Sequence, residues 1–235
     1  MSKVKVTITM SLDGFVAGPN QSEKDPLGIG GEELHQWLLP LKTFRESHGE
    51  EGGEVNASTP IAEAILGNVG ATIMGRGMFG GGPGPWRDEW KGYWGEDPPY
   101  HHPVFVLTRY SREPLAMQGG TTFHFVTEGI ESALDQARAA AGDRDISIGG
   151  GANVVQQYLA AGLLDELLIS VVPTLLGGGA RLFDNLGEPK PGLRQVEVIE
   201  APGVTHIRYA PAGDRGNASW QAARREAATP KTKRR

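Results

Sequence analysis

The chain has 235 residues, a net charge of −5 and no Cys, and 39% of its residues are hydrophobic. The lack of Cys excludes a disulfide framework, a thiolate nucleophile and a Cys-bearing zinc site, and the hydrophobic content is too high for a disordered chain. The 34 Gly are roughly twice the usual share, but they follow no triplet period, which excludes a collagen-like fibre.

The first predicted element is a strand over residues 4–10, where polar and apolar residues alternate. This segment lacks the apolar stretch of a signal peptide, and no run of about 18 apolar residues follows it, so we expect a cytoplasmic protein without a membrane-spanning segment. A polar, Gly-rich loop over 11–31 precedes a predicted helix over 32–44, which has acidic residues in its first turn. A shorter helix is predicted over 61–66.

Strands and helices alternate in the centre of the chain, which predicts an α/β sheet with parallel pairs. The last two strands are typical of an antiparallel hairpin, which makes the sheet mixed. We therefore predict a single α/β domain over residues 1–210, with about eight strands flanked by helices. The remaining expected strands cover 71–74, 104–108, 122–126, 145–148, 166–172, 193–199 and 205–210, and the remaining expected helices cover 130–141 and 152–161.

Residues 211–235 form a basic tail, with seven Lys or Arg and two acidic residues. We expect this tail to be solvated and disordered, and contact with nucleic acid or an acidic surface is the alternative. The rest of the chain carries a net charge of −10, which argues against a dedicated nucleic-acid binder.

The segment 80–103 combines Gly and Pro with the large aromatic residues Trp86, Trp90, Tyr93 and Trp94. It is too rich in turn residues for a regular helix or strand. Four large aromatic side chains are costly to leave in water, which favours a long ordered loop or a lid. A floppy insertion is the alternative.

The Gly clusters follow predicted strands, where a bare backbone can approach a phosphate closely. Gly149, Gly150 and Gly151 lie between a strand and a helix, an arrangement that predicts an anion site at the helix N-terminus; a simple tight turn is the alternative. The string from Gly75 to Gly80 matches the G-x-G-x-x-G dinucleotide pattern. The glycines and prolines that follow forbid a sustained helix, so we reject a Rossmann site there.

Arg76 and Arg109 each follow a predicted strand directly. If these strands are neighbours, the two guanidinium groups converge and suit a phosphomonoester such as the 2′-phosphate of NADPH. Taken singly, each is more typical of a solvated charge at a strand end. The six His show no spacing typical of a metal site, and none is predicted.

Four stretches together carry a resemblance to a known family. They are VTITMSLDGFVAG (6–18), ATIMGRGMF (71–79), VFVLTR (104–109) and ISIGGGANVVQQYLAAGLLDELLISVVPTLLGGGARLF (146–183). Their order and spacing resemble the dihydrofolate-reductase-like superfamily, and most of all the C-terminal reductase domain of riboflavin-biosynthesis (RibD) proteins. The zinc deaminase that this branch usually pairs with the reductase has no signature here, so a stand-alone form is expected.

The resemblance implies a mixed sheet, NADPH as hydride donor and a homodimer. It implies that the nicotinamide is bordered by Thr9, Met10, Ala17 and Gly18. It implies that phosphates contact Gly75, Arg76, Gly77 and Met78, with the 2′-phosphate facing Arg76, Thr108 and Arg109. It implies that the pyrophosphate is cradled by Gly149, Gly150, Gly151, Ala152 and Asn153.

The candidate catalytic groups are Asp13, which matches the RibD branch, and Glu33. An Asp-Gly turn and a surface residue at a helix start are their respective alternatives. Phe15 and Trp37 are expected to contact the substrate. We expect an NADPH-dependent reductase of a small pterin-like or ribosylaminopyrimidine-like heteroaromatic or carbonyl compound; the alternative is a catalytically silent, dimeric NADP(H)-binding module.

Overall fold

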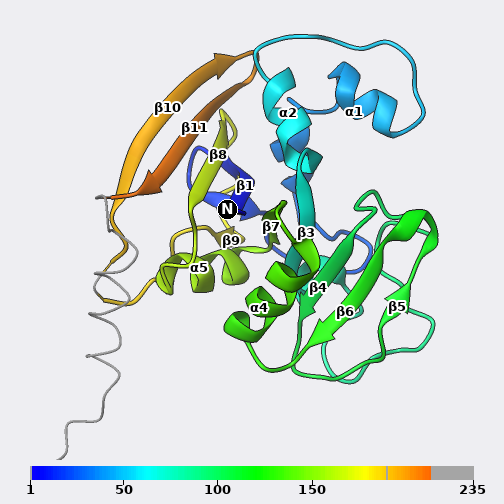
Figure 1. Ribbon diagram of the computed structural model, residues 1–235. Helices are drawn as coiled ribbons and strands as arrows, with labels where there is room; N and C mark the ends of the chain where they lie inside the picture. The colour runs from blue at the N-terminus through cyan, green and yellow to red at the C-terminus, as the bar shows by residue number, and fades with distance from the viewer. Residues whose placement is uncertain (1, 189, 213–235) are drawn as a thin grey trace, which may run out of the picture.

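A nine-stranded mixed sheet forms the centre of the computed structural model, which describes residues 2–188 and 190–212 (Figure 1). The six middle strands are parallel, and an antiparallel strand or hairpin extends each side. The order across the sheet is β10 (Leu193–Ala201), β11 (Val204–Pro211), β8 (Glu166–Val172), β1 (Val4–Ser11), β7 (Asp145–Gly150), β3 (Val69–Gly75), β4 (Pro103–Leu107), β6 (Thr122–Val126) and β5 (Leu115–Ala116). The predicted α/β class and C-terminal hairpin are confirmed.

Two helices cover one face of this sheet. Strand β3 is buried at all of its positions, as expected for a central parallel strand that is covered on both faces. Alternate strand residues such as Ile73 and Ile148 pack in one cluster with α4 (Ile130–Ala141) and α5 (Ala152–Ala160). The Tyr158 hydroxyl of α5 donates to the carbonyl of Ile130 at 2.7 Å, which ties the two helices together.

The opposite face is covered by two separate pieces. Over β8 and β11 lies a cluster built around Leu34, Trp37 and Leu41, which includes α2 (Thr59–Leu66). Over β3, β4 and β6 lies the aromatic loop, residues 80–102, whose Trp94 stacks on Phe123 with ring centroids 6.0 Å apart. The predicted ordered loop is therefore what the structure contains. Each piece hides its own half of the sheet.

The predicted helix over 32–44 is wrong. The structure has a short 3-10 helix, η1 (Gly31–His35), then turns, then a separate helix α1 (Lys42–Ser47). Pro40 explains the break, because it lacks a backbone N–H and disfavours helical backbone at the residue before it.

Several short elements were not predicted. Strands β2 (Phe15–Ala17) and β9 (Ala180–Arg181) pair with each other in a small antiparallel sheet. A four-residue helix, α3 (Arg76–Phe79), follows β3, and a 3-10 turn, η2 (Gln118–Gly120), lies between β5 and β6. These elements are too short to leave a periodic signal in the sequence.

The basic tail falls almost wholly at residues 213–235, which lie outside the described residues. The domain boundary at residue 210 remains a prediction. Within the described part of the chain, no helix has the length and apolar character needed to cross a membrane.

Candidate active site

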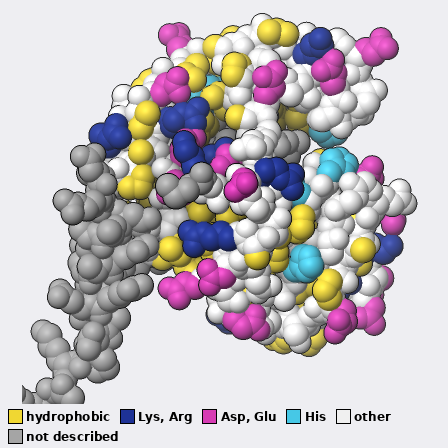
Figure 2. All heavy atoms as spheres, viewed as in Figure 1, with side chains coloured by type: hydrophobic (Ala, Val, Ile, Leu, Met, Phe, Trp, Pro, Cys, Tyr) yellow, Lys and Arg dark blue, Asp and Glu magenta, His cyan; other side chains and the backbone are white. Residues whose placement is uncertain are grey.

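A large cleft opens where the parallel strands end. Its volume is about 1440 Å³, and it is bordered by the carboxyl ends of β3, β4 and β7 and by the start of α5. In the space-filling view the surface is hollowed between the part that carries α1 and α2 and the part that carries β4 to β6 (Figure 2). Ligands of open α/β sheets bind at this edge.

Most residues predicted to contact a cofactor border this cleft. Those in its lining are Thr9, Ala17, Gly75, Arg76, Gly77, Met78, Thr108, Arg109, Gly149, Gly150, Gly151, Ala152 and Asn153. Segments far apart in the sequence thus meet at one place, although their roles stay predictions.

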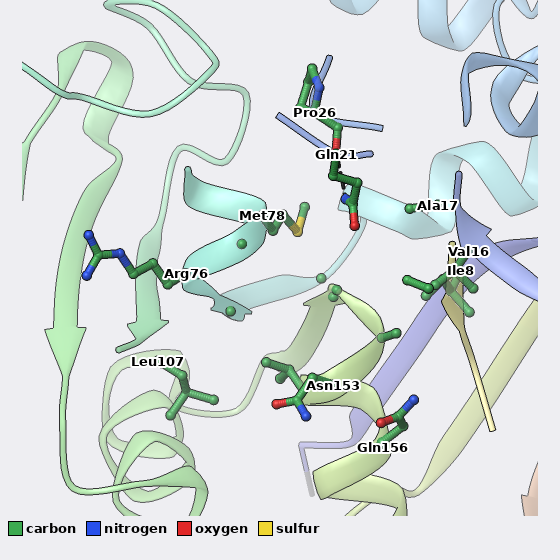
Figure 3. A pocket seen from close by; sticks show the side chains of 18 of the residues that line it. Ile8, Val16, Ala17, Gln21, Pro26, Arg76, Met78, Leu107, Asn153 and Gln156 are labelled. Atoms are coloured by element: carbon green, nitrogen blue, oxygen red, sulfur yellow. Dashed lines mark hydrogen bonds between the residues drawn. The ribbon is translucent and has the colours of Figure 1, made fainter. Parts of the chain in front are cut away.

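The triple Gly lines the cleft at the junction of β7 and α5, just before Asn153, which Figure 3 shows between Arg76 and Ala17. Gly151 is the N-cap of α5 and has no side-chain cap, and a Cβ placed on it would meet nothing within 4 Å. The cleft is therefore open directly in front of a helix N-terminus, where free N–H groups and the helix dipole favour an anion.

Gly75 lets the end of β3 come close to α5. A Cβ on this residue would lie 2.8 Å from Cγ2 of Val154, so a larger residue would push the two elements apart. Helix α3 then makes a single turn before Gly80 ends it with a φ of 87°. The short helix agrees with the rejection of a Rossmann site at this string.

Arg76 marks one end of the cleft. In Figure 3 its side chain leaves α3 in the direction opposite to that of Met78. Its Nε and Nη2 atoms are buried and have no hydrogen-bond partner in the described part of the chain, and burial lowers the pKa of this guanidinium. Arg109, at the end of β4, lines the same region and is exposed. A desolvated cation without a counter-charge is a site for an anion.

Figure 3 shows Ala17 on the side of the cleft away from Arg76, and Trp37 lines the cleft as well. Its indole N–H donates to Oγ1 of Thr9 at 3.3 Å, and Ala17 lines the cleft with both. The Trp37 ring meets His206 edge-on, with centroids 4.8 Å apart, and Ser58 and Ser170 hydroxyls bond the two ring nitrogens of this buried His. The polar network fixes the Trp37 ring at the wall.

Three other predicted contacts do not belong to the described lining. Met10 packs against the main core, and Phe15 is buried beneath the guanidinium of Arg181, which lies 4.5 Å from the ring centroid. Gly18 is buried, and its N–H donates to the carbonyl of Leu27 at 2.8 Å. These residues support the walls of the cleft from behind.

The two candidate catalytic carboxylates also lie outside the lining. The Asp13 carboxylate accepts hydrogen bonds from Oγ of Ser11 at 2.6 Å and from the N–H groups of Leu176 and Gly177 at 3.1 and 2.7 Å. The Ser11 hydroxyl and these backbone donors lower the pKa of Asp13. Glu33 is exposed on η1. In this structure the Asp13 carboxylate therefore links its own turn to the loop that contains Leu176 and Gly177. This agrees with the alternative that Asp13 belongs to an Asp-Gly turn.

His35 was not predicted as a site residue, although it lines the cleft and lies in the same segment as Trp37. Its Nδ1 is buried without a hydrogen-bond partner among the described residues. Burial lowers the pKa of His35, and the backbone of Gly31 partly opposes this effect. The only sequence signal was its position two residues before Trp37.

Two loops face each other across the cleft. Pro83, Gly84, Tyr93 and Trp94 of the aromatic loop line it on one side, and Gln21, Pro26 and Leu27 line it on the other. An ion pair between Arg87 and Glu23, 2.8 Å long, links the loops. No group of three or more His, Asp or Glu in the described residues is arranged to hold a metal ion.

The family model of the RibD C-terminal domain matches residues 2–207. The chain belongs to the RibD C-terminal domain family. A comparison with curated proteins finds no match.

Solved structures share the fold of this RibD C-terminal domain. A putative riboflavin biosynthesis protein from Shewanella sp. PV-4 has a TM-score of 0.57 and 23% identity, and the match covers 90% of this chain and 99% of that one. Acinetobacter baumannii RibD has a TM-score of 0.53 and 16% identity, with 91% and 59% covered. A Thermotoga maritima diaminohydroxyphosphoribosylaminopyrimidine deaminase/5-amino-6-(5-phosphoribosylamino)uracil reductase has a TM-score of 0.53 and 13% identity, with 90% and 57% covered. The chain spans less than two thirds of the last two proteins.

Proposed function

We propose that this chain is an NADPH-dependent reductase of a small heteroaromatic or carbonyl substrate, pterin-like or ribosylaminopyrimidine-like. One observation carries most of the weight. The Nε and Nη2 atoms of Arg76 are buried and have no hydrogen-bond partner within the described residues, and the cleft that Arg76 lines also contains the open N-terminus of α5. Two separate anion-favouring places in one cleft suit the pyrophosphate and the 2′-phosphate of this dinucleotide.

The chain's own residues would hold the cofactor in three places. The start of α5, with Gly149 to Asn153, would take the pyrophosphate, and Arg76 with Arg109 would take the 2′-phosphate. The nicotinamide would then lie toward Thr9, Ala17 and Trp37, at the opposite end of the cleft.

When bound, NADPH supplies the hydride, and the protein's part is to orient the ring and keep water out. Trp37 and the aromatic loop provide apolar walls for this purpose. A reduction also consumes a proton. His35 lines the cleft, and burial favours its neutral imidazole, so we propose that it would hold and orient the water that delivers this proton, in place of Asp13 and Glu33.

Membership of the RibD C-terminal domain family supports the choice of reaction. The Thermotoga maritima protein of the same fold is named as both a deaminase and a 5-amino-6-(5-phosphoribosylamino)uracil reductase. Extending a pyrimidine-reductase-like activity to this chain is part of the proposal.

Binding of NADPH and NADH, followed by the fluorescence of the dihydronicotinamide, tests the proposal. We expect a clear preference for NADPH. Arg76→Ala should reduce that preference by roughly 10- to 100-fold, because a hydrogen bond to a charged group contributes about 1.5–3 kcal/mol. Arg138→Ala, an exposed residue of α4 that does not line the cleft, is the control and should change nothing. Equal affinity of the wild-type chain for both nucleotides would contradict the proposal.

A catalytically silent NADP(H)-binding module is the second candidate. The observation in its favour is that Asp13 and Glu33 do not line the cleft. Loss of NADPH absorbance with dihydrofolate, a ribosylaminopyrimidinone or a panel of carbonyl compounds separates the two candidates. Tight NADPH binding without turnover of any compound supports the module.

We also propose a cytoplasmic homodimer. The lack of Cys suits a reducing compartment. Strand β10 is the outermost strand of its side of the sheet, and Val196 and Val198 on it are 49% and 51% exposed. An edge strand with exposed apolar residues is a template for pairing with another chain. Light scattering on the full chain should give twice the monomer mass, and Val198→Lys should shift the mass toward the monomer.

A further inference from the structure

The ring of Trp86, in the aromatic loop, stacks against the guanidinium of Arg76. The guanidinium carbon of Arg76 lies 3.8 Å from the Trp86 ring centroid, and the Tyr110 ring is 5.4 Å away. A cation over the face of an indole is attracted by the negative π surface. The stack therefore fixes where the Arg76 charge lies in the cleft.

The same indole also holds the segment that carries Arg109. Its N–H donates to the carbonyl oxygen of Tyr110 at 2.7 Å, and the N–H of Tyr110 donates to Oγ1 of Thr108 at 3.2 Å. These bonds shape the chain on both sides of Arg109, which is itself exposed. One side chain thus contacts Arg76 directly and the backbone next to Arg109.

Trp86 is fixed in turn by its own neighbours. Its ring meets Phe125 and Phe79 edge-on, with centroids 4.9 and 5.6 Å apart. Arg112 lies 5.6 Å from the same ring and donates to the carbonyls of Trp90 and Asp88 at 2.7 and 3.0 Å. The aromatic loop is therefore held at Trp86 itself and just after it, at Asp88 and Trp90.

An aromatic ring against Arg76 leaves the charge of the guanidinium intact, whereas a carboxylate would not. A carboxylate that held Arg76 would neutralise its charge and compete with an incoming anion. No carboxylate of the described residues pairs with Arg76 or Arg109. The indole restrains the position of the cation without neutralising its charge.

We propose that Trp86 is a positioning residue that sets the preference of this cleft for nucleotides with a 2′-phosphate, by seating Arg76 and holding the segment that carries Arg109. The inference rests on the proposed function, since it concerns the same phosphate site. It assigns a role to the aromatic loop that goes beyond covering the sheet.

The test compares dissociation constants of the full chain for NADPH and NADH, and for adenosine 2′,5′-bisphosphate and 5′-AMP. Trp86→Leu removes both contacts and should reduce the preference for the 2′-phosphate by roughly 2- to 30-fold, the range of a cation–π contact. Trp86→Phe keeps a ring beneath Arg76 but loses the hydrogen bond to Tyr110, so its loss should be smaller.

Trp90→Phe is the matched control. It also removes an indole N–H that donates to a backbone carbonyl, that of Phe79 at 3.1 Å, but the cation over the Trp90 ring is Arg87, 5.3 Å from the ring centroid, and not Arg76. Its nucleotide preference should remain that of the wild-type chain. Because the readout is a ratio of two affinities, a partly unfolded sample lowers both values and leaves the ratio intact, and Trp86→Phe remains usable if Trp86→Leu does not fold.

An unchanged ratio in Trp86→Leu or, where that variant does not fold, in Trp86→Phe overturns the inference, as does an equal loss in Trp86→Phe and Trp90→Phe. In those cases a wild-type preference for NADPH leaves the proposed function standing. A wild-type chain that binds both members of each pair equally overturns the proposed function, and the role of Trp86 falls with it.

Discussion

Asn153→Asp is expected to weaken NADPH binding by about a hundredfold while leaving the fold intact. Asn153 is the second residue of α5 and lines the middle of the cleft, so the change places a negative charge beside the proposed pyrophosphate position. Two like charges about 5 Å apart repel by roughly 3 kcal/mol at an effective dielectric constant near 20. The replacement has the same shape, so affinity changes through charge alone.

The free energy of unfolding of Asn153→Asp is expected to rise slightly, although its affinity for NADPH falls. An acidic residue in the first turn of a helix interacts favourably with the helix dipole, by a few tenths of a kcal/mol or more. The bond from Nε2 of Gln157 to Oδ1 of Asn153, 2.7 Å long, can persist with Asp. Isothermal titration and urea denaturation measure the two effects. Asn153→Ala is the control with little loss of affinity, and unchanged NADPH affinity in Asn153→Asp would contradict a pyrophosphate at α5.

The free energy of unfolding is expected to fall as the pH is lowered from 6.5 to about 4. Burial lowers the pKa of His206 and of His102 to about 4, the latter helped by the charges of Arg144 and His101. In the unfolded chain each His takes up its proton near pH 6.5, whereas in the folded chain it stays neutral. The unfolded state therefore binds more protons in this window, and stability is lost as pH falls through it.

Urea denaturation at a series of pH values measures this dependence. Each of the two His should contribute a slope of about 1.4 kcal/mol per pH unit between its unfolded and folded pKa values. His206→Gln removes one titrating group and should lower the slope by that amount, whatever its effect on stability at pH 7. A slope that stays the same in His206→Gln would show that this His titrates alike in both states.

Elements with a strong local pattern could be predicted from the sequence. The strands over 122–126 and 166–172 and the helix over 130–141 have the expected bounds, because the first segment alternates, the second is a nearly continuous apolar run and the third has helical spacing. The prediction of one helix over 32–44 was wrong because it did not take account of Pro40, which is a local signal for a helix break. Strands β2 and β9 had no such signal, since Phe15 pairs with Arg181 far along the chain.

Some residues of the candidate site could likewise be predicted from the sequence, and others could not. Gly149 to Gly151, Arg76 and Arg109 follow strands directly, and the ends of neighbouring parallel strands must meet at one edge of the sheet. Their meeting in one cleft was therefore predictable. The positions of His35, Tyr93 and Trp94 depend on how two long loops pack over the opposite face of the sheet. No local pattern encodes that packing, so these residues were missed as cleft residues.

The aromatic loop contacts Arg76 and also lines the cleft. Trp86 stacks on Arg76, whereas Tyr93 and Trp94 of the same loop line the cleft. A nucleotide at Arg76 and a second ligand at Tyr93 and Trp94 both bind best when the loop keeps this packed arrangement, so each ligand stabilises the arrangement that the other needs. Such linkage is reciprocal and needs no change of shape. We therefore expect nucleotide and second ligand to bind with positive cooperativity.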